Sequence, residues 1–372
     1  MDWKKELREN VTTVEELNQV LSLNLSEEEA NRMEEIIQAF PMSVPGYYLS
    51  LIDKSDEDDP VKKLCIPSIR ETDLSGSFDT SGESDNTILP GLQHKYKQTA
   101  LVLSTNQCAM YCRHCFRKRL VGVSSGEINK HFDKIISYIN KHTEISNVLL
   151  SGGDSFLLDN EKIKSYLEEL TKISHLDFIR FGTRTPVVFP MRIYEDEKLL
   201  DILKNYSKKK KIYIVTHFNH PNEITEESKR AVTALLNTGA IIRNQTVLLK
   251  GINDSADTLI RLIRNLTRIG VIPYYIFQCR PVTGVKNQFQ VPLRKASKII
   301  EKAKSQLNGQ GKCFRYVMSN ERGKIEILGE APDNHMIFKY HQAKYEQDQG
   351  RLFSLKIAEK ECWVSGETLL TE

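Results

Sequence analysis

The chain of 372 residues is 40% hydrophobic and 27% charged, a composition typical of a globular protein that can bury a sizeable core. Its 52 basic residues nearly balance 49 acidic ones, and the formal net charge of +3 gives no overall attraction to nucleic acid. No apolar run reaches the roughly 18 residues of a membrane span, and the charged start at Met1–Lys5 does not resemble a signal peptide. We therefore expect a cytoplasmic protein without nucleic-acid or membrane partners.

The first 90 residues are expected to form a helical extension and a linker. Two pairs of residues are typical of capping boxes and precede apolar residues at helical spacing: Thr13 with Glu16, and Ser26 with Glu29. Residues 1–60 are therefore predicted to be largely helical. Residues 55–90 are rich in Asp, Ser, Gly and Thr, which favours an irregular connecting segment.

Between residues 91 and 292, apolar β-rich segments alternate with amphipathic helical stretches. The expected strands are 99–104, 147–150, 178–182, 212–216, 240–245 and 271–277. A repeated strand-then-helix pattern favours a parallel sheet wound by crossover helices. Six such units fit a partial (β/α)6 barrel better than a closed barrel of eight strands. The predicted fold class is therefore α/β.

Chemically suggestive residues follow each predicted strand. In order along the chain they are Cys108, Ser151–Asp154, Arg184, His217, Gln245 and Gln278–Arg280. Because the C-terminal ends of parallel barrel strands meet at one mouth, we expect these residues to lie close together.

Residues 293–372 are expected to form a C-terminal segment. After a predicted helix over 295–306, the apolar runs 314–318 and 325–328 predict a hairpin that returns Lys324 toward the barrel mouth. The tail from residue 333 is predicted to pack as a small cap.

Three cysteines, Cys108, Cys112 and Cys115, present three thiols within eight residues of loop. Three thiolate ligands suit a 4Fe-4S cluster that leaves its fourth iron open. Seven cysteines in all, an odd number, do not resemble a disulfide framework. Structural zinc is the competing interpretation, but it needs a fourth ligand, and only His114 is near in sequence. Buried core cysteines are less compatible with so polar a loop.

The pattern Cys108-x-x-x-Cys112-x-x-Cys115 resembles the cluster motif of the radical S-adenosylmethionine (SAM) superfamily. Several longer strings narrow the resemblance to the lysine 2,3-aminomutase family: 111–119, 151–154, 184–188, 216–227 and 274–279. The resemblance runs from about Trp3 to about Gly329. It implies an isomerase that moves an amino group between the α and β carbons of an amino acid. It also implies SAM bound at the open iron, and pyridoxal 5'-phosphate.

The resemblance also implies roles for single residues. Lys324 matches the lysine that holds pyridoxal phosphate, and Arg117 matches the arginine that grips the substrate carboxylate. Gly152, Gly153 and Asp154 match the turn that receives the amino group of the methionine part. On local sequence alone, that turn is also compatible with a helix-capping aspartate. Further cofactor contacts are implied for His217, Gln245 and Lys95.

Two departures concern the substrate. At Arg280 and Val317 the lysine-specific enzymes carry aspartates that hold the distal ammonium of lysine. A cation at Arg280 would repel that ammonium and would suit a carboxylate. We therefore hypothesise an acidic or neutral amino acid as substrate, with glutamate as the leading candidate.

Other departures concern cofactors and assembly. The basic stretch that holds the phosphate in the family is reduced to His94–Lys97, and Thr99 replaces an arginine, which weakens the expectation of phosphate binding. The usual C-terminal zinc-binding cysteines are missing apart from Cys362, so we predict no zinc and an altered homo-oligomer. Arg113 and Lys118 are interpreted as solvated basic residues.

Several alternatives remain open from the sequence. Within enzymes they are a lysine 2,3-aminomutase acting on free or protein-bound lysine, and a radical SAM enzyme that has lost pyridoxal phosphate. From another class comes an iron-sulfur redox sensor without turnover. An enzyme would need an electron donor such as flavodoxin or ferredoxin.

Overall fold

The computed structural model describes residues 3–123 and 126–366, whose strands form one 12-stranded sheet in chain order. The strands are β1 (Thr87–Leu89), β2 (Leu92–Tyr96), β3 (Thr99–Thr105), β4 (Asn147–Gly152), β5 (Phe178–Gly182), β6 (Lys211–Thr216), β7 (Ile241–Leu248), β8 (Ile272–Gln278), β9 (Arg315–Ser319), β10 (Gly323–Glu330), β11 (His335–Ala343) and β12 (Leu352–Lys356). Neighbouring strands from β3 to β9 are parallel, and the other pairs are antiparallel.

The six strands predicted for the barrel are confirmed as β3 to β8, and β9 adds a further parallel strand. The segment between β8 and β9 is long enough for a crossover because it contains helix α14 (Leu293–Ser305). No pairing joins β1 to β12 within the described ranges, so the barrel is open, as predicted.

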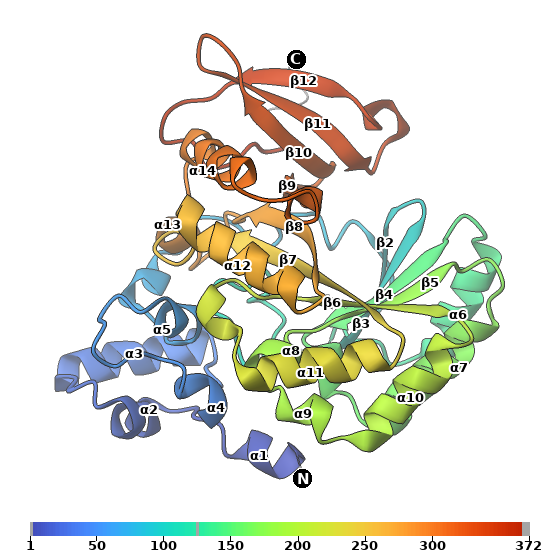
Figure 1. The fold of residues 1–372 in the computed structure, drawn as a ribbon, viewed down its shortest axis with the longest axis horizontal. Coiled ribbons are helices and arrows are strands. Elements are labelled where there is room, and N and C mark those ends of the chain that lie inside the picture. Colours follow the sequence, from blue (N-terminus) through green and yellow to red (C-terminus); the bar gives the residue numbers. More distant parts are fainter. Residues whose placement is uncertain (1–2, 124–125, 367–372) are drawn as a thin grey trace.

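The helices that follow the barrel strands pack on the outer side of the sheet (Figure 1). They are α6 (Phe132–Lys141), α7 (Asn160–Lys172), α8 (Thr185–Val188), α9 (Met191–Tyr194), α10 (Glu197–Ser207), α11 (Glu226–Asn237) and α12 (Ala256–Arg268), besides α14, whereas the short α13 (Lys286–Phe289) contacts residues 69–72. Side chains alternate across each strand. On β5, Ile179 and Phe181 are fully buried in the main hydrophobic core, whereas Arg180 between them lies on the opposite face, toward the barrel interior.

The N-terminal extension consists of α1 (Trp3–Arg8), α2 (Val14–Leu21), α3 (Glu27–Ala39) and α4 (Gly46–Leu49). Both predicted capping boxes are confirmed, at Thr13 and at Ser26. The extension is fastened to the barrel near the cysteines, because the Asn10 side chain donates a 2.8 Å hydrogen bond to the Ala109 carbonyl.

The predicted irregular segment 55–90 is more ordered than expected. It contains α5 (Pro60–Cys65), the 3-10 helix η1 (Ile69–Thr72) and β1. Helix α5 begins where Asp59 accepts a hydrogen bond from the Lys62 amide and Pro60 occupies the first turn. This helix was not predicted, because the polar composition of the whole segment was weighed above the Asp59–Pro60 pair, which is typical of a helix start.

The predicted hairpin is confirmed as β9 and β10, and β10 to β12 form the C-terminal cap by continuing the same sheet. The cap and the N-terminal helices lie at opposite ends of the molecule (Figure 1). The division into domains at 1–90, 91–292 and 293–372 stays a prediction.

The sheet curls around an interior. Lys95 on β2 and Asn320, just after β9, are far apart in the strand order, yet the Lys95 Nζ donates a hydrogen bond to the Asn320 carbonyl. Inward side chains from distant strands can therefore meet. Among the described residues, no helix is both long and apolar enough to span a bilayer.

Candidate active site at the barrel mouth and interior

The three predicted cluster ligands lie together in the loop after β3. All three are free, partly exposed thiols. Burial raises the pKa of the Cys108 thiol, and the charges of Asp154, Cys115 and Cys112 raise it further, so the three cysteines lie close together. Within the described ranges the three sulfurs do not form a set of atoms all within 4.8 Å of one another.

Arg184, which follows β5, joins the cluster loop to several surrounding elements. Its Nη1 donates to the Cys112 Sγ at 2.6 Å, and its Nε donates to the His217 carbonyl at 3.1 Å. Its Nη2 pairs with Glu223 at 2.5 Å. A guanidinium so held places a permanent positive charge against one predicted cluster ligand.

The interpretation of Arg113 and Lys118 as solvated residues was wrong. Both are buried, and both pair with the fully buried Glu71 of η1. Arg113 binds it with two parallel contacts, from Nε at 2.9 Å and from Nη2 at 2.6 Å, and also donates to the Phe40 carbonyl. These ion pairs fix the loop between Cys112 and Cys115 against the N-terminal extension.

Gly152 and Gly153 lie where the loop after β4 packs directly on the cluster loop. The Gly153 amide donates to the Thr105 carbonyl at 2.5 Å. A Cβ on Gly153 would come within 2.2 Å of the Gln107 oxygen, and Gly152 adopts a φ of +117°, which side chains rarely tolerate. Both glycines are thus required by backbone contact with the residues just before Cys108.

We expect Gly153→Ala to displace the cluster loop. The new methyl group would collide with backbone atoms that cannot rotate away, at a cost of about 1–3 kcal/mol in stability. Iron and sulfide content after reconstitution should fall well below the wild-type value. Gly309→Ala is the matched control because a Cβ there meets nothing within 4 Å, and equal iron content in both variants would contradict the expectation.

Asp154 uses both carboxylate oxygens within the chain. One accepts from the Thr183 hydroxyl at 2.6 Å and from the Phe156 amide at 3.0 Å, and the other accepts from the Arg184 amide at 2.7 Å. Asp154 therefore caps the 3-10 helix η2 (Ser155–Leu157). Its pairing with an ammonium group stays a prediction.

His217 and Gln245 meet inside the mouth. Burial and the charge of Arg184 lower the pKa of His217 to about 4, although a hydrogen bond with Gln245 acts in the opposite direction. His217 is therefore a neutral imidazole at physiological pH. Gln245 was predicted at the end of a strand. It lies within β7 instead, because β7 continues to Leu248.

Arg117 is held by a residue that the sequence did not single out. Its Nε donates to Glu83 at 2.9 Å, and its Nη1 lies 3.3 Å from the Ser151 hydroxyl and 3.4 Å from the Gly152 carbonyl. Glu83 also pairs with Arg119 at 2.9 Å. A substrate carboxylate at Arg117 would therefore share the guanidinium with Glu83.

Arg280 lies next to this group but lacks a full set of partners. The guanidinium carbons of Arg117 and Arg280 lie 4.7 and 4.3 Å from the centre of the same ring, Phe116. The Arg280 Nη1 is buried and has no hydrogen-bond partner in the described chain. Burial lowers the pKa of Arg280, whereas the Glu83 carboxylate raises it.

Lys324 points into the barrel interior from β10. Its Nζ lies over the ring faces of Tyr275 at 4.5 Å and Tyr96 at 5.8 Å, and it donates a hydrogen bond to the Gln342 side-chain oxygen at 3.0 Å. Burial, and then the positive charges of Arg180, Arg280 and Lys95, lower its pKa to about 7. A substantial fraction of this amine is therefore uncharged near neutrality, as an imine-forming lysine requires.

The turn before Lys324 is fixed by its own contacts. The Asn320 side-chain oxygen accepts hydrogen bonds from the Arg322 and Gly323 amides, each at 3.1 Å. A Cβ on Gly323 would lie 2.3 Å from the Gln342 carbonyl oxygen. Only glycine therefore allows β11 to approach closely enough to hold Lys324 inside.

The remaining predicted residues divide between the interior and the surface. Val317 is fully buried and pairs in register with Phe277 on β8. Burial, followed by the charge of Arg280, lowers the pKa of Lys95 to about 7. His94, by contrast, bonds to the Tyr138 hydroxyl at 2.9 Å on the helical side, and Lys97 is exposed. The stretch expected to hold phosphate thus sends only part of its side chains inward.

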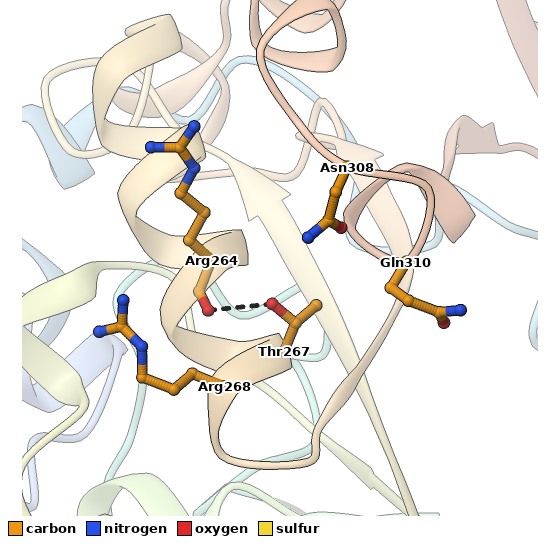
Figure 2. Close-up of a pocket in the computed structure, with 5 residues that line it drawn as sticks. All are labelled: Arg264, Thr267, Arg268, Asn308 and Gln310. Carbon is orange, nitrogen blue, oxygen red and sulfur yellow. Dashed lines mark hydrogen bonds between the residues drawn. The ribbon is translucent and has the colours of Figure 1, made fainter.

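One hollow on the surface is lined by none of these groups. It has a volume of about 580 Å³ and is lined by Arg264, Thr267, Arg268, Asn308 and Gln310. Figure 2 shows these side chains on the outside of α12 and on the turn that follows α14. No predicted site residue lines this hollow.

Comparisons with known proteins bear on the same residues. A sequence model of a 4Fe-4S single cluster domain matches residues 97–183. An L-lysine 2,3-aminomutase from Clostridium subterminale is 40% identical over 311 residues, which are 83% of this chain and 73% of that protein. One from Bacillus subtilis is 39% identical over 344 residues, 89% of this chain and 71% of that protein. A glutamate 2,3-aminomutase from Clostridioides difficile is 39% identical over 291 residues, 77% of this chain and 67% of that protein.

Proposed function

Because this chain belongs to the lysine 2,3-aminomutase family of radical SAM enzymes, we propose that it moves an amino group between the α and β carbons of a non-lysine amino acid, most favourably glutamate. Membership of the family implies a 4Fe-4S cluster, SAM and pyridoxal phosphate as cofactors. The observation that carries the proposal is the position of the Lys324 amine against the rings of Tyr275 and Tyr96, inside the barrel whose mouth carries the three cysteines, with a pKa of about 7.

When bound, the cluster with SAM would supply a radical able to remove a substrate hydrogen, and pyridoxal phosphate would stabilise the rearranging substrate radical. Cys108, Cys112 and Cys115 would hold the cluster, and Arg184 would donate a hydrogen bond to the Cys112 sulfur. The neutral His217 and Gln245 offer polar contacts at the mouth without adding charge.

Lys324 would hold pyridoxal phosphate when substrate is absent. Its amine is kept partly neutral by burial, and the rings of Tyr275 and Tyr96 provide apolar faces on which a planar ring can pack. Gly323 and Asn320 hold the strand start that carries this amine.

The substrate proposal rests on the two guanidinium groups beside Phe116. Arg117 would bind the α-carboxylate, and the unpartnered Nη1 of Arg280 would bind a distal carboxylate. Val317 adds no negative charge that could attract a lysine ammonium. The relative named glutamate 2,3-aminomutase supports this choice, although the other two relatives are named for lysine.

The proposal extends to partners and location. A radical SAM enzyme needs an electron donor, and flavodoxin or ferredoxin would serve. Free thiols and an oxygen-sensitive cluster favour a reducing cytoplasm. Assembly as a homo-oligomer is proposed without a defined interface.

The test is anaerobic incubation of the reconstituted protein with reductant, SAM and pyridoxal phosphate, with glutamate, lysine, glutamine and alanine offered separately. We expect a β-amino acid product from glutamate. Formation of 5'-deoxyadenosine without any rearranged amino acid would reject the aminomutase assignment for these substrates. Faster turnover of lysine than of glutamate would reject the substrate proposal.

The pKa of Lys324 predicts how capture of pyridoxal phosphate depends on pH. Only the neutral amine attacks an aldehyde, so the capture rate should rise with pH and level off above about 7, not near the ordinary value of 10.5. Stopped-flow absorbance between pH 5.5 and about 9 measures this midpoint. A rate still increasing tenfold per pH unit at pH 9 would show that Lys324 has an ordinary pKa.

A further inference from the structure

We propose that Arg180 and Arg243, on the inward faces of β5 and β7, form the binding site for the phosphate group of pyridoxal phosphate. This inference rests on the proposed function. It adds an anion site from residues outside the stretch 94–97 that was expected to hold the phosphate.

Arg243 is a cation enclosed by aromatic rings. Its guanidinium carbon lies 5.1 Å from the ring centre of Tyr213 and 4.8 Å from that of Tyr274. Its Nε is buried and has no hydrogen-bond partner within the described residues. Ring faces attract a cation but cannot accept the full set of its N–H groups, so the guanidinium is left with donors to offer.

Arg180, on β5, also has a buried guanidinium nitrogen without a hydrogen-bond partner among the described residues. Its Nη2 donates to the Asn147 side-chain oxygen at 2.6 Å, but its Nε is buried without a partner in the described chain. Burial lowers its pKa, and the charge of Arg243 lowers it further. Two adjacent guanidinium groups in a low-dielectric interior are costly unless an anion lies between them.

The pair lies on the side of Lys324 where the phosphate is needed. After burial, the positive charge of Arg180 does most to lower the pKa of Lys324, ahead of Arg280 and Lys95, so Arg180 and this amine share the same interior. The Lys324 Nζ is 4.5 Å from the Tyr275 ring centre, which is 4.0 Å from the Tyr274 ring centre. Tyr274 in turn borders Arg243 at 4.8 Å. A pyridine ring on Lys324 that packs along these tyrosines would extend its phosphate toward the arginines.

A phosphate suits this site better than a carboxylate does. Its several oxygens and double negative charge can accept donors from both guanidinium groups at once, which a carboxylate bound at the mouth could not do. The substrate groups are expected at Arg117 and Arg280, which contact Phe116 and not the tyrosines beside Arg243. The two arginine pairs therefore divide the anions between cofactor and substrate.

The experiment compares pyridoxal phosphate with pyridoxal, which lacks the phosphate, on the full-length protein under anaerobic conditions. Binding is titrated by visible absorbance, and the bound aldehyde is fixed with borohydride and located by peptide mass mapping. We expect Lys324 to be labelled by both compounds in the wild type. In Arg243→Met the affinity for pyridoxal phosphate should fall about 10- to 100-fold while that for pyridoxal is unchanged.

Three controls keep the result decisive. Arg268→Met removes an exposed arginine of α12 and should alter neither affinity. Arg243→Lys retains the positive charge but loses the planar guanidinium that makes two parallel hydrogen bonds, so it should give an intermediate affinity for pyridoxal phosphate if folding is intact. With the unaltered protein, inorganic phosphate should compete with pyridoxal phosphate but not with pyridoxal.

The outcomes separate the two proposals. If neither compound labels Lys324 in the wild type, the proposed function fails. If both label it but Arg243→Met and Arg180→Met leave the preference for pyridoxal phosphate unchanged, only the phosphate site is overturned. Loss of glutamate binding in Arg243→Met, with the cofactor still bound tightly, would also overturn it.

Discussion

Glu71→Ala is expected to lower the free energy of unfolding by about 3–5 kcal/mol and to prevent stable cluster binding. The substitution removes the shared partner of two buried cations, because the side chains of Arg113 and Lys118 are 2% and 4% exposed. Each would be left as an uncompensated charge in the interior. Arg113 lies between two cysteines of the cluster loop, so its displacement should release that loop.

Urea denaturation of the cluster-free protein measures the loss of stability, and iron content after reconstitution measures the effect on the site. Although burial raises the pKa of Glu71, Arg113 and Lys118 hold it below its usual 4.5. Its contribution should therefore be fully present above about pH 4.5 and be lost as the pH falls further, so the variant and the wild type should converge in acid. Glu28→Ala, which breaks an exposed pair with Arg32, is the control and should cost about 0.5 kcal/mol or less. Equal losses in the two variants would show that the buried network contributes little.

The parts of the fold that repeat a local pattern were predictable. Strands β3 to β8 were found because each combines a short apolar run with a following amphipathic helix, and their shared direction then brings Cys108, Arg184 and His217 to one mouth. The cysteine spacing is likewise local. The seventh parallel strand, β9, was expected only as half of a hairpin with β10. Its sequence does not show that the preceding helix α14 also returns it to a position beside β8.

The ion pairs that hold the site were not predictable by the same reasoning. Glu71 and Glu83 are single acidic residues in a polar segment, and their arginine partners lie 42 and 34 positions away. No local signal distinguishes them from solvated carboxylates. Arg113 and Lys118 were misjudged for the complementary reason, since basic residues are normally exposed unless a partner is known.

One missed residue did carry a signal. Arg243 lies on a strand that begins with Ile241 and Ile242, and because Ile242 is buried against the helices, the alternation of side chains places Arg243 on the interior face of the barrel. A lone cation on the inward face of a barrel strand needs an anion. The sequence does not show that Arg180 and Tyr274 lie beside Arg243, so a shared anion site could be inferred only from the structure.

Arg280→Met is expected to reduce kcat/KM for glutamate at least about 30-fold while leaving that for glutamine within a few-fold of wild type. A buried charge-assisted contact is worth ~2 kcal/mol or more. Glutamate would lose this contact in the variant, whereas glutamine has no distal charge and makes no such contact. Methionine keeps an unbranched side chain over Phe116, where the guanidinium carbon now lies 4.3 Å from the ring centre. The effect should therefore be one of charge and not of packing.

The ratio of the two substrates is the informative quantity, because damage to the fold or to the cluster would lower both activities together. Lysine turnover should rise relative to glutamate turnover, since the repulsion between Arg280 and a distal ammonium is removed. Equal losses for glutamate and glutamine would mean that Arg280 stabilises the barrel mouth through Phe116 and Glu83 and does not bind the distal group of the substrate. In that case the acidic-substrate proposal would fail, because Arg117, which would bind the α-carboxylate and already binds Glu83 at 2.9 Å, does not distinguish glutamate from other amino acids.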